Sequence, residues 1–223
     1  VTGNPSKHSD IDIHILLDSK TTRRERGNEI IDGFLIEYFA NSSKRHHQYL
    51  EEDLKSRCKI NAHMFCTGEI LLDKTGELKR LVQYPKKYLK KKNPELNKMQ
   101  IEIAKYHIWD MCDNLEEVFD SNTEEFYLVF YNFLNKLFET YAQFLQFDTV
   151  PVYKLRRFLV NEQDKKKYLV SDFPDKKFTK MIVSAINIKD KTKMMEEFKT
   201  ITKYALKKMG GFNIDGWKIR SPA

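Results

Sequence analysis

The stretch of this chain that says most about its fold is SDIDIHILL, residues 9–17. Apolar and polar residues alternate along it, which is the period-two pattern of a β-strand with one buried face. Such a strand places Asp10, Asp12 and His14 on one side and the intervening isoleucines on the other. Because residues two apart on a strand lie about 6.6 Å from each other along it, Asp10 and Asp12 present two carboxylates to one spot.

A third carboxylate, Glu37, lies in the predicted strand FLIEYF, residues 34–39, which follows the turn signal Asp32-Gly33. If the two strands are neighbours, Glu37 completes a cluster that can hold two metal ions about 3.5–4 Å apart. Like charges in an apolar setting favour a cation, and oxygen ligands with open positions suit Mg²⁺. We therefore predict that Asp10, Asp12 and Glu37 are metal ligands and catalytic residues. From the residues alone, solvated carboxylates on an exposed strand remain the alternative.

Other patterns in the first part of the chain are weaker. Residues 18–30 are polar, and we expect a loop or an exposed helical turn there. Residues 44–64 are expected to form a polar helix, and residues 69–73 a short strand. The turn Lys74-Thr75-Gly76 then leads into a predicted helix over 77–88.

Beyond Pro94 the apolar period changes to that of helices. Apolar residues recur at intervals of three and four residues over 101–118 and over the aromatic-rich stretch 126–144. We expect the aromatic face of 126–144 to be mainly core. Further helices are predicted near 175–186 and 190–209, the last ending at Gly210-Gly211. The tail from residue 212 is expected to be irregular, with Trp217 packed back. Strands first and helices after them indicate an α+β fold with two lobes.

The run Asp10-Ile11-Asp12, followed about 25 residues later by Ile36-Glu37-Tyr38, resembles the DNA polymerase beta-type nucleotidyltransferase superfamily. It is similar in particular to the branch that contains aminoglycoside and lincosamide nucleotidyltransferases and the minimal nucleotidyltransferases. The segment TGEILLD, residues 67–73, and a helical lobe after the core also resemble this branch. The resemblance implies a nucleotidyltransferase-fold mixed β-sheet domain over residues 1–94 and a C-terminal α-helical bundle over residues 95–223.

The resemblance also implies a chemistry. Asp10 and Asp12 would bind the Mg²⁺ ions that bridge the phosphates of a nucleoside triphosphate, expected to be ATP. Glu37 would complete the metal that activates an acceptor hydroxyl, and attack at the α-phosphorus would release pyrophosphate. The expected acceptor is a small molecule such as an antibiotic. Two alternatives stay open: a minimal nucleotidyltransferase that AMPylates a protein, and a non-catalytic module that binds nucleotide or nucleic acid.

One feature departs from the family pattern, which has a Gly-Ser turn upstream of the paired acids to hold the triphosphate. This chain offers only Gly3-Asn4, close to Asp10. We expect the Gly-Ser turn to precede Val1, so that residues 1–94 lack their N-terminal segment. Without such a turn, the chain would be a degenerate and inactive member.

Three further residues are predicted to contact the nucleotide. Ser9 could donate to a phosphate, although a role in the turn that enters the strand fits equally. Lys154 and Arg157 belong to a basic helical turn after Pro151 that suits a triphosphate, with a solvated basic turn as the alternative. For His14, beside the acids, a structural role is favoured over contact with substrate.

Composition sets the remaining expectations. The 223 residues carry a net charge of +7, a mild basic excess that suits an anionic partner without identifying it. The lysine-rich run 86–92 is compatible with nucleic acid, but a solvated face is favoured. No apolar stretch of about 18 residues and no leader are present, so we expect no membrane partner and a cytoplasmic location. The three cysteines form no disulfide framework. A homodimer is compatible with the sequence.

Overall fold

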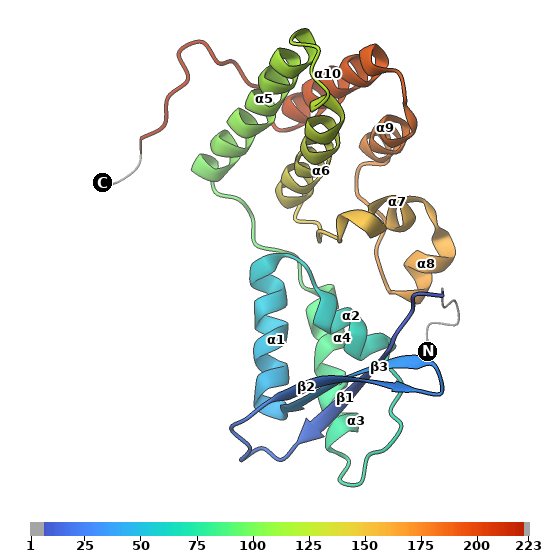
Figure 1. Cartoon of the computed structure of the whole chain (residues 1–223). Helices are drawn as coiled ribbons and strands as arrows, with labels where there is room; N and C mark the ends of the chain where they lie inside the picture. The colour runs from blue at the N-terminus through green and yellow to red at the C-terminus, as the bar shows by residue number, and fades with distance from the viewer. Residues whose placement is uncertain (1–6, 221–223) are drawn as a thin grey trace. The chain divides into compact units, whose positions relative to one another are not determined.

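The structure, a computed structural model, describes residues 7–220, which fall into two compact units (Figure 1). The first comprises the chain up to Lys91 together with Lys166–Val170, and the second comprises Lys92–Lys165 and the chain from Ser171 onward. The described elements are a mixed three-stranded sheet followed by helices, so the predicted α+β class is confirmed. The assignment of residues 1–94 and 95–223 to a catalytic and a helical domain stays a prediction.

The sheet has the strand order β1-β3-β2. β1 (Ile11–Leu17) runs parallel to β3 (Phe34–Ser42), and β2 (Glu25–Ile31) pairs with β3 in the antiparallel sense. Between β2 and β3 the chain turns at Asp32 and Gly33, whose φ angles of 50° and 81° suit a two-residue hairpin. β3 takes the central position and is paired along both of its edges.

The strand β2 corrects the prediction of a loop or helical turn over residues 18–30. Its sequence, ERGNEII, is polar because it forms the edge of the sheet and stays mostly exposed on both faces. Gly27 leaves room for the Tyr38 ring, which lies across this position: a β-carbon on Gly27 would come within 2.4 Å of the Tyr38 hydroxyl and displace that side chain. That hydroxyl donates to Glu25 Oε1 at 3.0 Å. The edge strand is therefore fitted to β3 by its side chains rather than by an apolar pattern.

Four helices complete the first unit: α1 (Ser43–Ser56), α2 (Ile60–Thr67), α3 (Glu77–Leu81) and α4 (Gln83–Lys90). The predicted helix over 44–64 is divided because α1 ends at Arg57, which has a φ of 57°. The buried Asp53 carboxylate then accepts from Asn61 Nδ2 and Ala62 N, both at 2.8 Å, and so fixes the start of α2. The two helices cover one face of the sheet.

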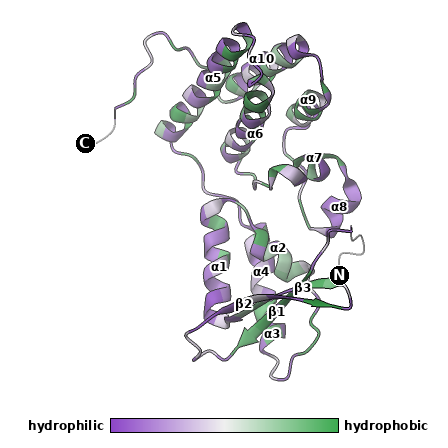
Figure 2. Cartoon of the chain, in the orientation of Figure 1, coloured by the Kyte–Doolittle hydropathy of each residue, from purple (hydrophilic) through white to green (hydrophobic). Residues whose placement is uncertain are grey.

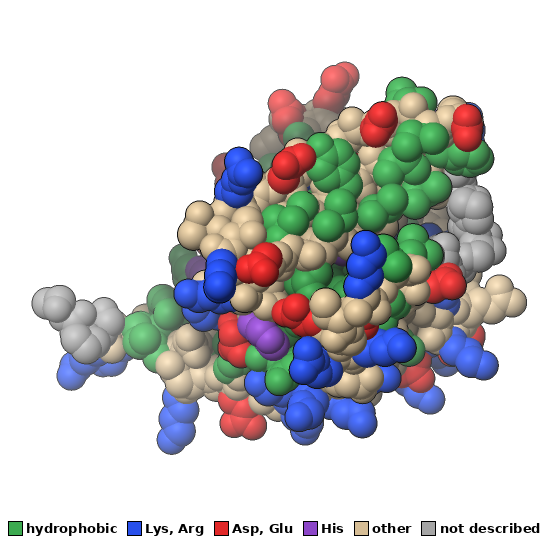
Figure 3. Space-filling model, turned by 90° about the horizontal axis from the view of Figure 1, so that it is seen from below, with side chains coloured by type: hydrophobic (Ala, Val, Ile, Leu, Met, Phe, Trp, Pro, Cys, Tyr) green, Lys and Arg blue, Asp and Glu red, His purple; other side chains and the backbone are tan. Residues whose placement is uncertain are grey.

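The predicted strand over residues 69–73 is wrong: this segment is irregular. Leu71 and Leu72 are 79% and 66% exposed, and the sheet formed by the described residues does not include them. Asp73 instead accepts from Lys79 N at 3.0 Å and helps to start α3. Apolar side chains also stay exposed on the outer face of the sheet, among them Ile11 and Ile15. Figure 3 shows apolar side chains gathered on part of the surface seen from below.

Among the described residues, the second unit contains α5 (Lys98–Asp120), α6 (Phe126–Phe144), α7 (Val152–Val160), α9 (Lys176–Asn187) and α10 (Lys191–Lys208). It also contains most of α8 (Glu162–Lys167), whose last two residues belong to the first unit. The helices predicted over 126–144, 175–186 and 190–209 are confirmed to within a few residues. Polar and apolar residues alternate around α5, α6 and α10, as in amphipathic helices (Figure 2). The aromatic face of α6 is core: Phe126, Phe130 and Phe138 are buried.

The tail packs back as predicted, with the Trp217 ring stacked on Tyr106 at 4.5 Å between centroids. Among residues 7–220, no helix combines the length and the apolar content that crossing a bilayer requires.

Candidate metal centre

The three predicted acids meet at the start of the parallel strand pair. Asp12 on β1 and Glu37 on β3 are register partners, so their side chains leave the same face of the sheet. Asp10 directly precedes β1. One carboxylate oxygen from each of the three residues lies within 4.8 Å of the others. This spacing allows a single ion to be shared by the three side chains.

The electrostatics of this cluster favour a cation. Burial raises the pKa of Asp12, and the neighbouring Asp10 and Glu37 carboxylates raise it further, against the opposing effects of His14 and Arg26. A carboxyl that is hard to ionise beside two other acids is ionised more readily when a positive ion is present. The cluster therefore has both the oxygen donors and the excess negative charge that a site for a hard divalent cation requires.

The sequence prediction missed two residues from β2 that surround Glu37. Asn28 is the register partner of Glu37 on the other side of β3. Oriented with its nitrogen toward the carboxylate, the Asn28 amide donates to Glu37 Oε1 at 3.3 Å. Arg26 Nη2 lies 3.5 Å from Glu37 Oε2. The signal for both was the alternation of Arg26 and Asn28 just before the hairpin turn, which places them on one face.

Arg26 is held by a second contact. Its guanidinium lies 4.8 Å from the centroid of the Phe39 ring, the register partner of Arg26 on β3. The Arg26 side chain nevertheless stays 66% exposed, whereas the Glu37 side chain is 18% exposed. Arg26 is therefore a cation at the rim of the acid cluster, and its contact with Phe39 directs its guanidinium toward Glu37.

His14 anchors the acid-bearing strand to the helices. Its ring stacks on Phe39, with 5.0 Å between centroids, and meets the edge of Phe65 on α2 at 5.4 Å. Both ring nitrogens are buried without a partner among the described residues. Burial lowers the pKa of His14, although Asp12 opposes the shift, so the ring is uncharged at neutral pH. These contacts favour the structural role for His14.

The other predicted nucleotide contacts stay predictions. Ser9 directly precedes Asp10, next to the cluster. Lys154 and Arg157 belong to α7 in the second unit. There Arg157 Nη2 donates to Asp164 Oδ1 at 2.6 Å, and the Lys154 ammonium lies 5.4 Å from the centroid of the Tyr153 ring. The Gly3-Asn4 pair, compared above with the Gly-Ser turn, lies outside the described residues.

Comparison with known proteins adds one remote likeness. No protein-family model matches the chain, and no curated protein matches it. Among solved structures, the chain is similar to a nucleotidyltransferase-like protein from Exiguobacterium sibiricum 255-15, with 10% sequence identity and a TM-score of 0.43. The match covers 88% of this chain and 61% of that one, so this chain spans about three-fifths of that protein's length. At this identity and TM-score the likeness assigns no function.

Proposed function

We propose that this protein is a Mg²⁺-dependent nucleotidyltransferase that moves a nucleoside monophosphate, AMP from ATP, onto an acceptor hydroxyl with release of pyrophosphate. The observation that carries the proposal is the approach of the Asp10, Asp12 and Glu37 carboxylates to within 4.8 Å of one another. The family resemblance of the same residues, noted in the sequence, supports the reaction type.

The donor set fits Mg²⁺. All three ligands are carboxylate oxygens, without the nitrogen or sulfur donors that favour zinc. Asp10 and Asp12 are exposed, which leaves room beside them for the waters and substrate phosphates that Mg²⁺ keeps as its remaining ligands. When bound, the metal would neutralise phosphate charge and lower the pKa of the acceptor hydroxyl.

The residues of the chain would have distinct roles. Asp10, Asp12 and Glu37 would together hold Mg²⁺, which would supply charge neutralisation to the nucleotide phosphates and activation to the acceptor hydroxyl. Asn28 would keep the Glu37 carboxylate oriented through its hydrogen bond. Arg26, exposed and within 3.5 Å of Glu37, would stabilise negative charge on the phosphates during transfer.

The acceptor is proposed to be the hydroxyl of a small molecule, such as an aminoglycoside-like or lincosamide-like antibiotic. The test incubates the full chain with Mg²⁺ and α-labelled ATP, using a panel of such compounds in one arm and a cell lysate in the other. Label on a small molecule and release of pyrophosphate support the proposal. Label on protein alone would replace the small-molecule acceptor by a protein hydroxyl.

Two variants make this test specific. Asp12→Asn should abolish both transfer of label and pyrophosphate release. Glu29→Gln, which changes an acid of the same sheet whose register partner is Ile36 on the opposite face, should leave both unchanged. If the wild-type chain binds Mg²⁺ no better than Asp12→Asn and labels no acceptor in either arm, the proposal is wrong.

A further inference from the structure

A polar pocket lies in the first unit, at the opposite end of β1 and β3 from the acids. It has a volume of about 380 Å³ and is formed by the loop after β1, the end of β3 and the first turns of α1. Hydroxyl, amide and cationic side chains line it, and no carboxylate does. The cationic residues are Lys20, Arg23, Arg24, Lys44 and Arg45. We call this site the cationic pocket.

Most of its positive charge is uncompensated. Arg45 pairs with Glu52, with 2.9 Å between Nη1 and Oε1. The other four cations form no ion pair with any carboxylate among residues 7–220. Two acids flank the cations in sequence, Asp18 and Glu25, and neither lines the pocket. Asp18 accepts from Lys20 N at 2.8 Å and shapes the loop, and Glu25 Oε1 accepts from the Tyr38 hydroxyl at 3.0 Å. Several like charges around one hollow raise the local positive potential, which favours an anionic ligand.

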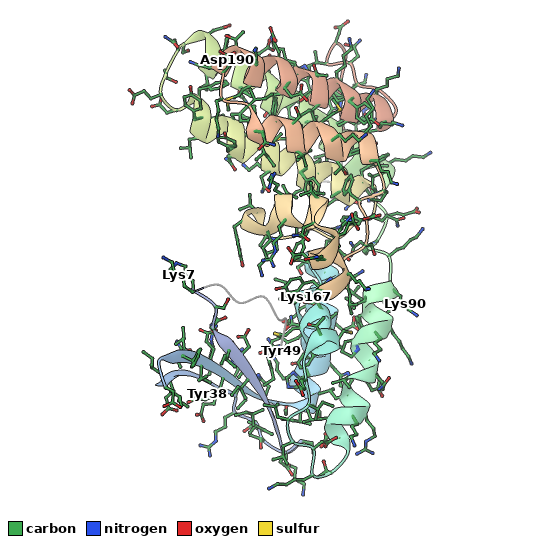
Figure 4. The ribbon with its side chains drawn as sticks, turned by 90° about the vertical axis from the view of Figure 1, so that its right-hand side faces the viewer. Lys7, Tyr38, Tyr49, Lys90, Lys167 and Asp190 are labelled. Carbon is green, nitrogen blue, oxygen red and sulfur yellow. The ribbon has the colours of Figure 1, made fainter. Side chains whose placement is uncertain are left out.

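A buried amide supplies a neutral donor. Asn41 is 5% exposed and lines the cationic pocket. The hydroxyl of Tyr49, on α1 (Figure 4), donates to Asn41 Oδ1 at 3.3 Å. This contact fixes the amide, and its Nδ2 group has no acceptor among the described residues. Because this residue lines the pocket and its Nδ2 group is not occupied by a protein acceptor, Asn41 can donate to a ligand that accepts hydrogen bonds.

The first turn of α1 adds to the same demand. Ser42, the N-cap of this 14-residue helix, forms no capping hydrogen bond, and the first turn carries no acidic residue. Its backbone N–H groups and the positive end of the helix dipole are therefore uncompensated by side chains. Ser42 and Lys44 both line the cationic pocket.

The cationic pocket is separate from the metal centre. Asn41 lies four residues beyond Glu37 along β3, which is about 13 Å. Between them the rings of His14, Phe39 and Phe65 are in contact and close this part of the sheet face. A ligand in the pocket is therefore not a ligand of the acids.

We propose that the cationic pocket binds a compact anion with two or more phosphate groups, represented by inorganic pyrophosphate and tripolyphosphate. Four unpaired cations balance the charge of about two phosphates. Arg23 and Arg24 can each present two N–H groups to phosphate oxygens. No apolar or aromatic side chain lines the pocket to stack on a base, so the pocket suits phosphate groups rather than bases.

The test is isothermal titration calorimetry of the full chain with pyrophosphate and with tripolyphosphate, at low ionic strength and with EDTA present. The chelator removes divalent cations, so the acid cluster cannot bind phosphate through a metal. The double variant Arg23→Gln/Arg24→Gln should weaken binding about tenfold or more, because charge-assisted hydrogen bonds are lost. Lys86→Gln/Lys87→Gln removes the same charge from exposed residues of α4 and should change the affinity less than twofold. Asp12→Asn should bind like the wild type.

Each outcome decides the proposal. Saturable binding that only the arginine double variant weakens supports it, provided that circular dichroism shows the variant folded with an unchanged melting temperature. No saturable binding of either anion by the wild type overturns it, as does equal weakening by the lysine double variant. A short oligonucleotide that binds and that tripolyphosphate fails to displace would also overturn it, in favour of a nucleic-acid surface. Because Asp12→Asn and EDTA are used, failure here is distinguishable from failure of the proposed transferase activity.

Discussion

Asp12 of β1 and Glu37 of β3 are directly opposed partners in a parallel strand pair, with Asn28 of β2 opposed to Glu37 on its other side. Three neighbouring strands thus bring two carboxylates and an amide into one row. Like charges directly opposed on a sheet destabilise it by about 0.2–1 kcal/mol. This row therefore costs stability in the absence of a cation, which is the arrangement expected of a binding site rather than of a structural element.

Replacing Asp12 should separate stability from activity. Asp12→Asn removes the like-charge repulsion, so the metal-free protein should gain about 0.2–1 kcal/mol at neutral pH. The pKa of Asp12 is raised in the folded state by burial and by its acidic neighbours. Its ionisation therefore lowers stability as pH rises through that pKa, and the difference between variant and wild type should vanish below about pH 4. Urea unfolding at pH 7 and pH 3.5 measures it.

In the same variant, nucleotidyl transfer should fall by at least about 100-fold, because a metal ligand is lost. Asp32→Asn is the control, since Asp32 has a φ of 50° that asparagine also adopts readily. Undiminished turnover in Asp12→Asn would contradict its role as a ligand. A loss of stability greater than in Asp32→Asn would contradict the repulsion.

Arg26 should weaken metal binding while assisting the reaction. Its Nη2 lies 3.5 Å from Glu37 Oε2, so it competes with a cation for that carboxylate. For an exposed pair the effect is about 0.5–1 kcal/mol, so Arg26→Gln should bind Mg²⁺ about two- to fivefold more tightly. Titration with Mn²⁺ as a paramagnetic probe measures the change. Arg80→Gln, an exposed arginine of α3, should leave the affinity at its wild-type value, and equal tightening in both variants would contradict a local effect.

The acids of this site were predictable because each lies in, or directly before, a strand with a strong apolar pattern. The sequence did not predict the strand register that brings them together. The cluster was predicted only on the condition that the two strands are neighbours. β2 escaped prediction since only Ile30 and Ile31 of its seven residues are large and apolar, and Ile30 is 74% exposed. An edge strand needs no apolar face, so its sequence carries little periodicity. The β2 residues Arg26 and Asn28, which surround Glu37, were therefore missed with the strand.

The opposite error was the strand predicted over residues 69–73. It also arose because the pairing of strands depends on the whole sheet and not on the local sequence. Leu71 and Leu72 have the composition of a strand, but a strand also needs a free edge to pair with, and that is a property of the whole sheet. The four long helices α5, α6, α9 and α10 were predicted because their period is local, and three of them begin at side-chain caps, namely Asn97, Asp175 and Asp190. The shorter α7 and α8 were not predicted, apart from a basic helical turn after Pro151.

His46 should make the first unit sensitive to mild acid. Its side chain is 2% exposed, and burial, with smaller effects of His14 and His47, lowers its pKa to about 4. The unfolded chain binds this proton near pH 6.5, so the stability is complete above that pH and is lost as pH falls through about 4. The loss can reach about 3 kcal/mol. Hydrogen exchange of β3 amides between pH 7 and pH 4 reports it for this unit.

His46→Phe should flatten that pH dependence. Phenylalanine can keep the edge contact that His46 makes with the Phe65 ring, 4.8 Å between centroids, but it cannot bind a proton. His47→Gln, beside it on α1, should keep most of the wild-type pH dependence, because His47 has only a small effect on the pKa of His46. Protection that falls equally with pH in His46→Phe and in the wild type would show that another group is responsible.

Asp175 should control the acid stability of the second unit. Its carboxylate accepts from the hydroxyls of Tyr141 and Tyr204, both at 2.9 Å, and from Phe178 N at the start of α9. Burial opposes ionisation, but these hydrogen bonds outweigh it and lower the pKa of Asp175. Its contribution to stability is therefore present above the unfolded value of about 3.9 and is lost as pH falls through the folded pKa.

Asp175→Asn should consequently cost about 1–3 kcal/mol at neutral pH, since charged hydrogen bonds become neutral ones around a buried tyrosine. It should also remove the loss of stability below about pH 4. The two tryptophans, Trp109 and Trp217, belong to the second unit, so fluorescence-detected urea unfolding reports on this unit.

Asp190→Asn is the matched control, because Asp190 caps α10 by accepting from Lys193 N without a tyrosine partner (Figure 4). Asparagine and aspartate cap about equally well, so the control should lose only a few tenths of a kcal/mol. Equal losses in the two variants would mean that Asp175 acts as a helix cap alone.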